Sequence, residues 1–91
     1  MFFILTVRNE QETRCIGCYD SLVRAQQHIL NNSGDMFEGG YYEYAVIVKV
    51  ETNRLYPNST EYNWYRFDVE DLAIEIPRPE ELCRFTAYIF G

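Results

Sequence analysis

Apolar residues in the first part of the chain form two short runs with a polar stretch between them. The first run, Phe2 to Arg8, is rich in aromatic and β-branched residues, and the second extends from Arg14 to Tyr19. Two such runs joined by a polar loop are typical of an antiparallel hairpin. Gly17, inside the second run, indicates a bulge or a close approach of another backbone.

The next segment has the spacing of a helix. Apolar side chains recur at intervals of three and four residues after a capping residue, Asp20 or Ser21, so they share one helical face. We expect an amphipathic helix of about three turns that ends in residues 31–34, with Gly34 as a left-handed C-cap. Its apolar positions are Leu22, Ala25 and Ile29.

The clearest strand pattern in the chain covers Tyr41 to Glu51. Its even-numbered positions carry tyrosine and valine, whereas the odd-numbered face is mixed, so we expect that face to be half exposed. Alternation of this length indicates a central strand. After a loop over residues 52–60, Glu61 to Val69 alternates again and should pair with this strand as a second hairpin.

The last third of the chain predicts shorter elements. Leu72 to Ile76 is expected to form a short strand, Pro79 to begin a helical turn, and Arg84 to Phe90 to form a last strand. Together these elements predict a single domain over residues 1–91. Its fold class is α+β, an antiparallel sheet of four to five strands with one amphipathic helix packed on one face.

The charge balance limits the partners that the chain can bind. The 91 residues include 14 acidic and 8 basic side chains, which gives a net charge of −6. Nucleic acid and anionic lipid both favour a basic surface, so neither is an expected partner. No apolar stretch approaches the roughly 20 residues of a membrane span, and the N-terminal residues lack the features of a secretory signal. We therefore expect a cytoplasmic protein.

Three cysteines and the single histidine supply the ligand count of a zinc site: Cys15, Cys18, Cys83 and His28. Alternation along a strand should point Cys15 and Cys18 in opposite directions unless Gly17 introduces a bulge. Cys15 also precedes the helix by several residues, whereas a redox-active CxxC has its first cysteine at a helix N-terminus. We expect ordinary reduced cysteines, with no metal ion and no other cofactor.

No residue pattern typical of an active site is present in the sequence. His28 has no serine or aspartate partner in a recognisable motif, and adjacent loop carboxylates such as Glu80 and Glu81 lack the apolar setting of a catalytic acid. Gly39 and Gly40 precede a strand rather than a helix, so they do not form a phosphate-binding loop. The sequence predicts a protein that is not an enzyme.

Two features point to a binding surface. Residues 61–81 hold seven acids against Arg66 and Arg78, and a concentrated acidic surface attracts basic partners. The eight tyrosines and Trp64 are too many to lie wholly in a small core, and exposed Tyr and Trp are common interface anchors. Two alternatives stay open: the acids only make the protein soluble, or Trp64 belongs to the core under the helix. The candidate binding residues are Tyr62, Trp64, Arg66, Asp68, Glu70, Asp71 and Glu75.

The order of elements resembles a known pattern. Gly17-Cys18-Tyr19-Asp20-Ser21 leads into a helix with Ala25, and a long aromatic strand and the Trp64-Tyr65 hairpin follow. Residues 1–70 are in this respect similar to a loose group of small, largely uncharacterised bacterial and phage proteins. The resemblance implies a phage-type accessory protein, a class that often inhibits host defence. It transfers no functional residues, and it accounts neither for the cysteines nor for the acidic C-terminal third.

We therefore expect a small, acidic, non-enzymatic binding protein that inhibits or modulates a host protein. A basic nucleic-acid-binding protein is the expected partner, because an acidic surface can take the place of phosphates. The alternative is a small-ligand pocket or a minor enzyme between helix and sheet, built from tyrosine hydroxyls, Arg66 and His28. A homodimer joined along an exposed strand edge is compatible with either function.

Overall fold

The computed structural model describes residues 1–9, 12–50, 59–70 and 72–80. Three predicted features lie wholly or partly outside these residues: the strand over Arg84 to Phe90, the zinc-ligand candidate Cys83, and Glu81 and Leu82 of the helical turn. Within the described ranges, no helix is long and apolar enough to cross a membrane. The elements are β1 (Phe2–Val7), β2 (Thr13–Tyr19), α1 (Leu22–Leu30), the short 3-10 turns η1 (Ser33–Asp35) and η2 (Glu38–Gly40), β3 (Tyr44–Val50), β4 (Ser59–Asp68) and β5 (Leu72–Ile76).

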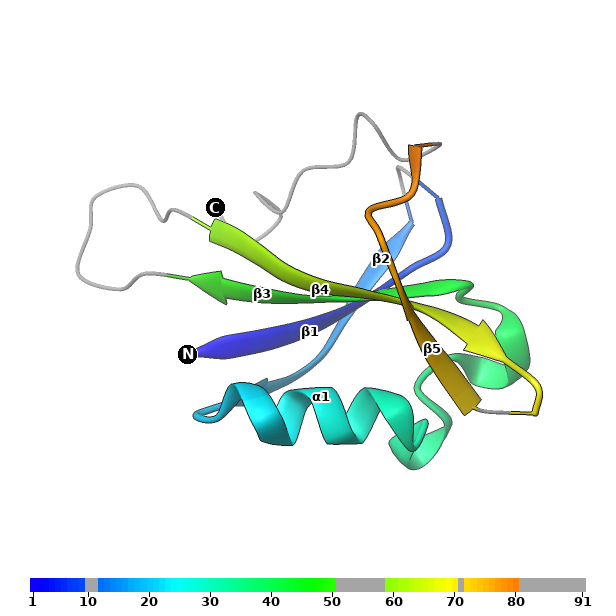
Figure 1. Ribbon diagram of the computed structural model, residues 1–91, viewed down its shortest axis with the longest axis horizontal. Helices are drawn as coiled ribbons and strands as arrows, with labels where there is room; N and C mark the ends of the chain where they lie inside the picture. Colours follow the sequence, from blue (N-terminus) through cyan, green and yellow to red (C-terminus); the bar gives the residue numbers. More distant parts are fainter. Residues whose placement is uncertain (10–11, 51–58, 71, 81–91) are drawn as a thin grey trace.

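The five strands form one sheet in the order β2-β1-β3-β4-β5, and all neighbouring strands are antiparallel. β3 occupies the centre, as its alternation predicts. α1 lies along one face of the sheet, and the edge strands β2 and β5 cross steeply over the three inner strands (Figure 1). The steep crossing reflects the twist that strands of L-residues adopt. The predicted α+β fold is confirmed.

The face of the sheet under α1 holds the larger of two cores. Ser21 caps the helix, because its hydroxyl accepts a hydrogen bond from the Arg24 backbone N–H at 3.3 Å. Ala45 and Ile47 of β3 are wholly buried there. The odd-numbered face of β3 is partly exposed, as its mixed composition predicts, because α1 covers Ala45 and Ile47 but leaves Lys49 exposed. The buried residues of this core are Ile4, Ala25, Ile29, Met36, Phe37, Ala45, Ile47, Tyr65 and Ala73.

The opposite face of the sheet carries a second buried cluster. Because β1 contributes to both clusters, its side chains are apolar at nearly every position instead of alternating with polar ones. The members of the second cluster are Leu5, Val7, Tyr44, Val46, Val48 and Trp64.

The connection from α1 to β3 differs from the predicted loop. Asn31 caps the helix, and the first left-handed residue is Asn32, at φ 45°. Gly34 is left-handed as well, at φ 63°, but it lies inside η1 and is not the C-cap. Asparagine tolerates this conformation because its short side chain can hydrogen-bond locally; Asn32 Oδ1 accepts from the Phe37 N–H at 3.1 Å.

β3 begins later than the alternation of the sequence predicts. Tyr41 and Tyr42 belong to the turn before the strand, and the first strand residue is Tyr44. Gly40 explains the break, because its φ of 101° lies in the region that favours glycine and an added Cβ would come within 3.3 Å of the Phe67 ring. The turn therefore packs tightly against β4.

Candidate functional site

One end of the sheet gathers most of the connections between strands. Val7, Tyr44 and Arg66 are neighbours in register there, on β1, β3 and β4. The β1–β2 loop, the two 3-10 turns and the β4–β5 turn therefore all lie at this end, with the β1–β2 loop and the β4–β5 turn at opposite edges of the sheet and the 3-10 turns near the β4–β5 turn (Figure 1). We call it the loop end, and its described residues are 8–9, 12–14, 31–43 and 66–70.

An exposed tyrosine at the loop end joins the β1–β2 loop to the turn before β3. The Tyr41 hydroxyl donates to the Glu12 carboxylate at 2.9 Å and accepts from Arg8 Nη1 at 2.9 Å. The Arg8 guanidinium lies 4.3 Å from the centre of the Tyr41 ring and pairs with Glu12 at 3.4 Å. Each of the three side chains thus restrains the other two.

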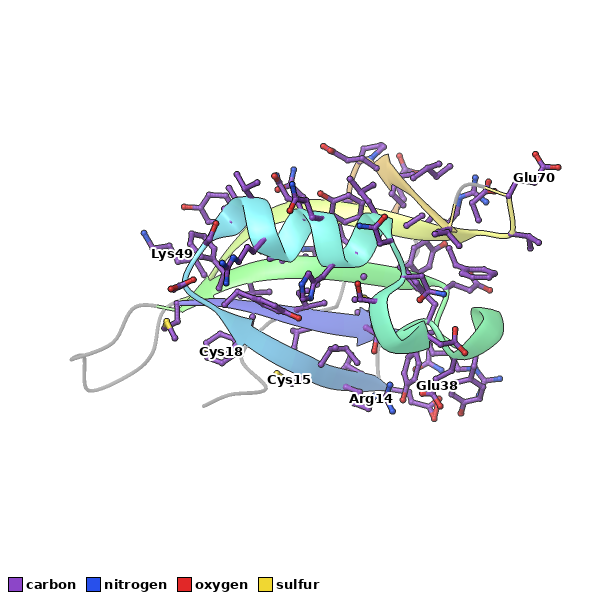
Figure 2. The ribbon with its side chains drawn as sticks, turned by 90° about the horizontal axis from the view of Figure 1, so that it is seen from below. Arg14, Cys15, Cys18, Glu38, Lys49 and Glu70 are labelled. Carbon is purple, nitrogen blue, oxygen red and sulfur yellow. The ribbon has the colours of Figure 1, made fainter. Side chains whose placement is uncertain are left out.

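A second set of contacts extends this arrangement. Arg14 pairs with Glu38 at 3.1 Å and lies 5.3 Å from the centre of the Tyr42 ring. Figure 2 shows Arg14 and Glu38 together beside the turns. The rings of Tyr41 and Tyr42 meet edge to face at 5.1 Å, so the two sets are continuous. We call the six residues the Arg–Tyr cluster: Arg8, Glu12, Arg14, Glu38, Tyr41 and Tyr42.

Hydrogen bonding favours the protonated forms of two residues in the Arg–Tyr cluster and so raises the pKa of each. The pKa of Tyr41 is raised mainly because its hydroxyl donates to Glu12, although the Arg8 charge acts in the opposite direction. The pKa of Arg8 is raised in turn, first by its hydrogen bond to Tyr41. At neutral pH Tyr41 is therefore protonated and Arg8 is charged. This arrangement suits recognition by charge and hydrogen bonds, because the phenol oxygen is not made nucleophilic.

Acids outnumber bases at the loop end. Within the Arg–Tyr cluster, Arg8 and Arg14 are already paired with Glu12 and Glu38. Figure 2 shows Glu70 projecting from the β4–β5 turn. Because each of these ion pairs is neutral, the net charge of the loop end is set by its other charged residues, and it is negative. Its further charged residues are the acids Asp35, Glu43, Asp68 and Glu70 and the base Arg66.

An open pocket of about 250 Å³ lies at the loop end, lined by Gly40, Glu43, Arg66 and Phe67. The Phe67 N–H donates to the Glu43 carbonyl at 2.8 Å, which fixes one side of the pocket. The alternative function required a pocket between helix and sheet that unites Arg66 with His28. His28 instead lies on α1 and contacts the Tyr19 hydroxyl at 3.0 Å. The described residues do not bring Arg66 and His28 together.

The predicted binding residues are divided among different parts of the molecule. Tyr62, which is 45% exposed, packs its ring against that of Phe2, away from the loop end. Glu75 lies on the helix side of β5 and accepts a hydrogen bond from Asn63 at 3.2 Å. Three of the predicted residues lie at the loop end: Arg66, Asp68 and Glu70. Asp71 is outside the described part of the chain.

Trp64 belongs to a core. It shares a face with the exposed Arg66, as strand alternation predicts, but Trp64 itself is only 4% exposed. Trp64 lies on the face of the sheet opposite α1. The predicted core position is therefore correct, but its predicted place under the helix is wrong. The indole Nε1 donates to Glu61 at 2.9 Å, and the Arg78 guanidinium lies 5.7 Å from the ring. Trp64 therefore supports the sheet from within.

β2 contains the bulge that decides how the CxxC motif is presented. Ile4 of β1 pairs with Gly17, whereas the next residue, Leu5, pairs with Cys15. Ile16 is therefore an extra residue that has no partner of its own on β1. The bulge occurs where Gly17 indicated one.

The bulge turns Cys15 and Cys18 toward the same face. Cys18 pairs with Phe3, which precedes Leu5 by two residues and so shares its face. Leu5 belongs to the cluster opposite α1, whereas His28 lies on α1. The sheet thus separates Cys15 and Cys18 from His28, whereas Cys83, the fourth proposed zinc ligand, lies outside the described residues. Among the described residues, no three His, Cys, Asp or Glu side chains are grouped to hold a metal ion.

Tyr65 is a buried titratable group with a strongly raised pKa. It is 1% exposed on the helix side of β4. Burial, with a smaller contribution from the Glu75 carboxylate, raises the pKa of Tyr65 to about 12. The folded protein therefore favours the neutral phenol.

Tyr65 should make the protein less stable at alkaline pH. In the unfolded chain a tyrosine ionises near pH 10, so the stability due to Tyr65 is complete below that pH and is lost as the pH rises to about 12. We expect this loss to amount to about 1–2 kcal/mol, and Tyr65→Phe to remove it. Urea denaturation at several alkaline pH values measures the effect. Tyr62→Phe, on the same strand but exposed, is the control; an equal change in both variants would contradict the assignment.

Comparison of the chain with protein-family models, curated proteins and solved structures finds no match.

Most residues of the Arg–Tyr cluster carry no signal in the sequence that would mark them as a site. Only Tyr41 and Tyr42 carried a signal, as members of a tyrosine surplus. Arg8 and Glu12 lie 33 and 29 residues from Tyr41. No local pattern indicates contacts over such separations, because the pairing of β1 with β3 creates them.

Proposed function

We propose that the protein is a non-enzymatic binding protein of the cytoplasm that inhibits or modulates a basic partner protein, and that the loop end is its binding surface. The observation that carries this proposal is the acid excess at the loop end, which also holds the Arg–Tyr cluster. Arginine and tyrosine are the side chains most enriched among interface hot spots. A basic nucleic-acid-binding protein fits best, because its phosphate-binding surface is complementary to a negative surface.

The contacts within the Arg–Tyr cluster favour binding for an energetic reason. A partner normally has to immobilise the side chains that it contacts, which costs about 0.5–1.5 kcal/mol for each long side chain. Arg8 and Tyr41 already hold one another through a hydrogen bond and a stacked contact. Part of that cost is therefore met before the partner arrives.

The acids outside the cluster would act at longer range. Glu43 lines the open pocket and Glu70 lies in the β4–β5 turn, and both are exposed. Exposed charges attract an oppositely charged partner over about 10 Å at an ionic strength of about 0.1 M. They raise the rate of association and set the orientation of the approach.

Reversing the charge at the loop end should weaken binding to a basic ligand. We expect Glu43→Lys/Glu70→Lys to reduce affinity for a fluorescent arginine- and lysine-rich peptide by roughly tenfold at low salt, with the difference shrinking as salt is added. Fluorescence anisotropy at several salt concentrations measures both effects.

The control makes the same change of net charge elsewhere. Asp20 lies before α1 and Glu80 lies beyond β5, and both are exposed. We expect Asp20→Lys/Glu80→Lys to reduce affinity much less. An equal loss in the two double variants would show that net charge alone governs binding, and salt-insensitive binding would contradict the electrostatic proposal.

A further inference from the structure

The two cysteines of β2 are arranged as a pair. Cys15 and Cys18 are both exposed, and both are free thiols. The bulge places them opposite Leu5 and Phe3, which are two positions apart on β1. The register therefore places them on one face like neighbouring side chains of a regular strand, although three positions separate them in the sequence.

The spacing suits a bridging ion better than a direct sulfur–sulfur bond. Two positions along a strand correspond to about 6.7 Å, which is near the upper limit of the Cα separation in disulfides. A metal ion between two thiolates adds a bond of about 2.3 Å to each sulfur, so the side chains need to approach less closely.

The ligand set determines which class of ion the pair would hold. Thiolates are soft ligands and select soft ions, among them Cu(I). A structural zinc site needs four ligands. His28 lies on α1, across the sheet, and the described residues offer no group of three ligands. Cu(I) is satisfied by two thiolates, so it is the ion that this pair fits.

We propose that Cys15 and Cys18 form a two-thiolate site for Cu(I) on the face of the sheet opposite α1. Each thiol gives up its proton to solvent when the ion binds, so binding of one Cu(I) releases two protons and leaves the site with one negative charge. Because both thiols are exposed, the ion reaches them without opening of the core. This site is independent of the binding surface proposed at the loop end.

Titration of the full, reduced chain with Cu(I) under anaerobic conditions, against the chromogenic chelator bicinchoninate, tests the proposal. We expect one Cu(I) per chain. Cys15→Ser and Cys18→Ser should each lower the affinity about 100-fold, because a single thiolate loses the advantage of chelation. Far-UV circular dichroism of both variants should match the original protein, since both side chains are exposed.

Two further variants distinguish this site from the zinc site suggested by the sequence. His28→Ala and Cys83→Ser should both bind Cu(I) as the original chain does. A loss of affinity in either variant would overturn the two-thiolate site. The absence of binding by the original chain, or binding that survives the double change Cys15→Ser/Cys18→Ser, would overturn it as well.

Discussion

Replacing Phe37 by alanine is expected to lower the free energy of unfolding by about 3–5 kcal/mol. The ring is wholly buried under α1, although the residue belongs to the connection between α1 and β3 rather than to a long element. It contacts the Phe67 ring at a centroid distance of 5.7 Å. Because small domains have a total stability of about 5–15 kcal/mol, the variant should be close to the limit of folding. Chemical denaturation followed by circular dichroism measures the change.

Two comparisons identify the cause of the expected loss. Phe37→Leu keeps most of the buried volume and should cost less than half as much. Val69→Ala removes a side chain that is 83% exposed in the β4–β5 turn, and we expect a change within about 0.5 kcal/mol. If Phe37→Ala cost no more than Val69→Ala, the connection would not be part of the core.

Trp64→Ala should destabilise the protein by a similar amount, about 3–5 kcal/mol. The variant removes a large ring from the cluster opposite α1 and leaves Glu61 without the indole donor at 2.9 Å. It also removes the surface on which the Arg78 guanidinium lies. Denaturation followed by circular dichroism is the appropriate measurement, because Trp64 is the single tryptophan and the variant loses that fluorescence.

Tyr62→Ala provides the matched comparison for Trp64. It lies two residues away on the same strand and is 45% exposed, so we expect its loss to cost less than about 1.5 kcal/mol. The difference between the two losses of stability distinguishes an aromatic residue in the core from one at the surface. If Trp64→Ala left the stability unchanged but weakened binding of the basic peptide, Trp64 would be an interface residue, as the sequence suggested, and not a core residue.

The position of Trp64 shows where reasoning from alternation succeeds and where it stops. Alternation correctly places Trp64 and Arg66 on one face of β4. It does not reveal which face α1 covers, because that depends on how the helix packs after the strands have paired. Tyr and Trp residues suit both cores and interfaces, so composition alone left both interpretations open.

The cysteines illustrate the same limit. A regular strand would point Cys15 and Cys18 apart, and only the register of β2 against β1 shows that they point together. Gly17 indicated that a bulge could occur. The consequence for the two thiols required the partner strand, because a bulge is defined by the residues that face it.

The sequence determined the local elements of this protein: the helix after Ser21, the strands and their antiparallel class. Hydrophobic periodicity, capping residues and turn residues act over a few positions, so they can be read along the chain. The tertiary structure alone decided which side chains meet at the loop end, which face buries Trp64 and how the cysteines pair. Those outcomes depend on contacts between segments tens of residues apart, and strand register and helix packing fix such contacts only when the whole sheet has formed.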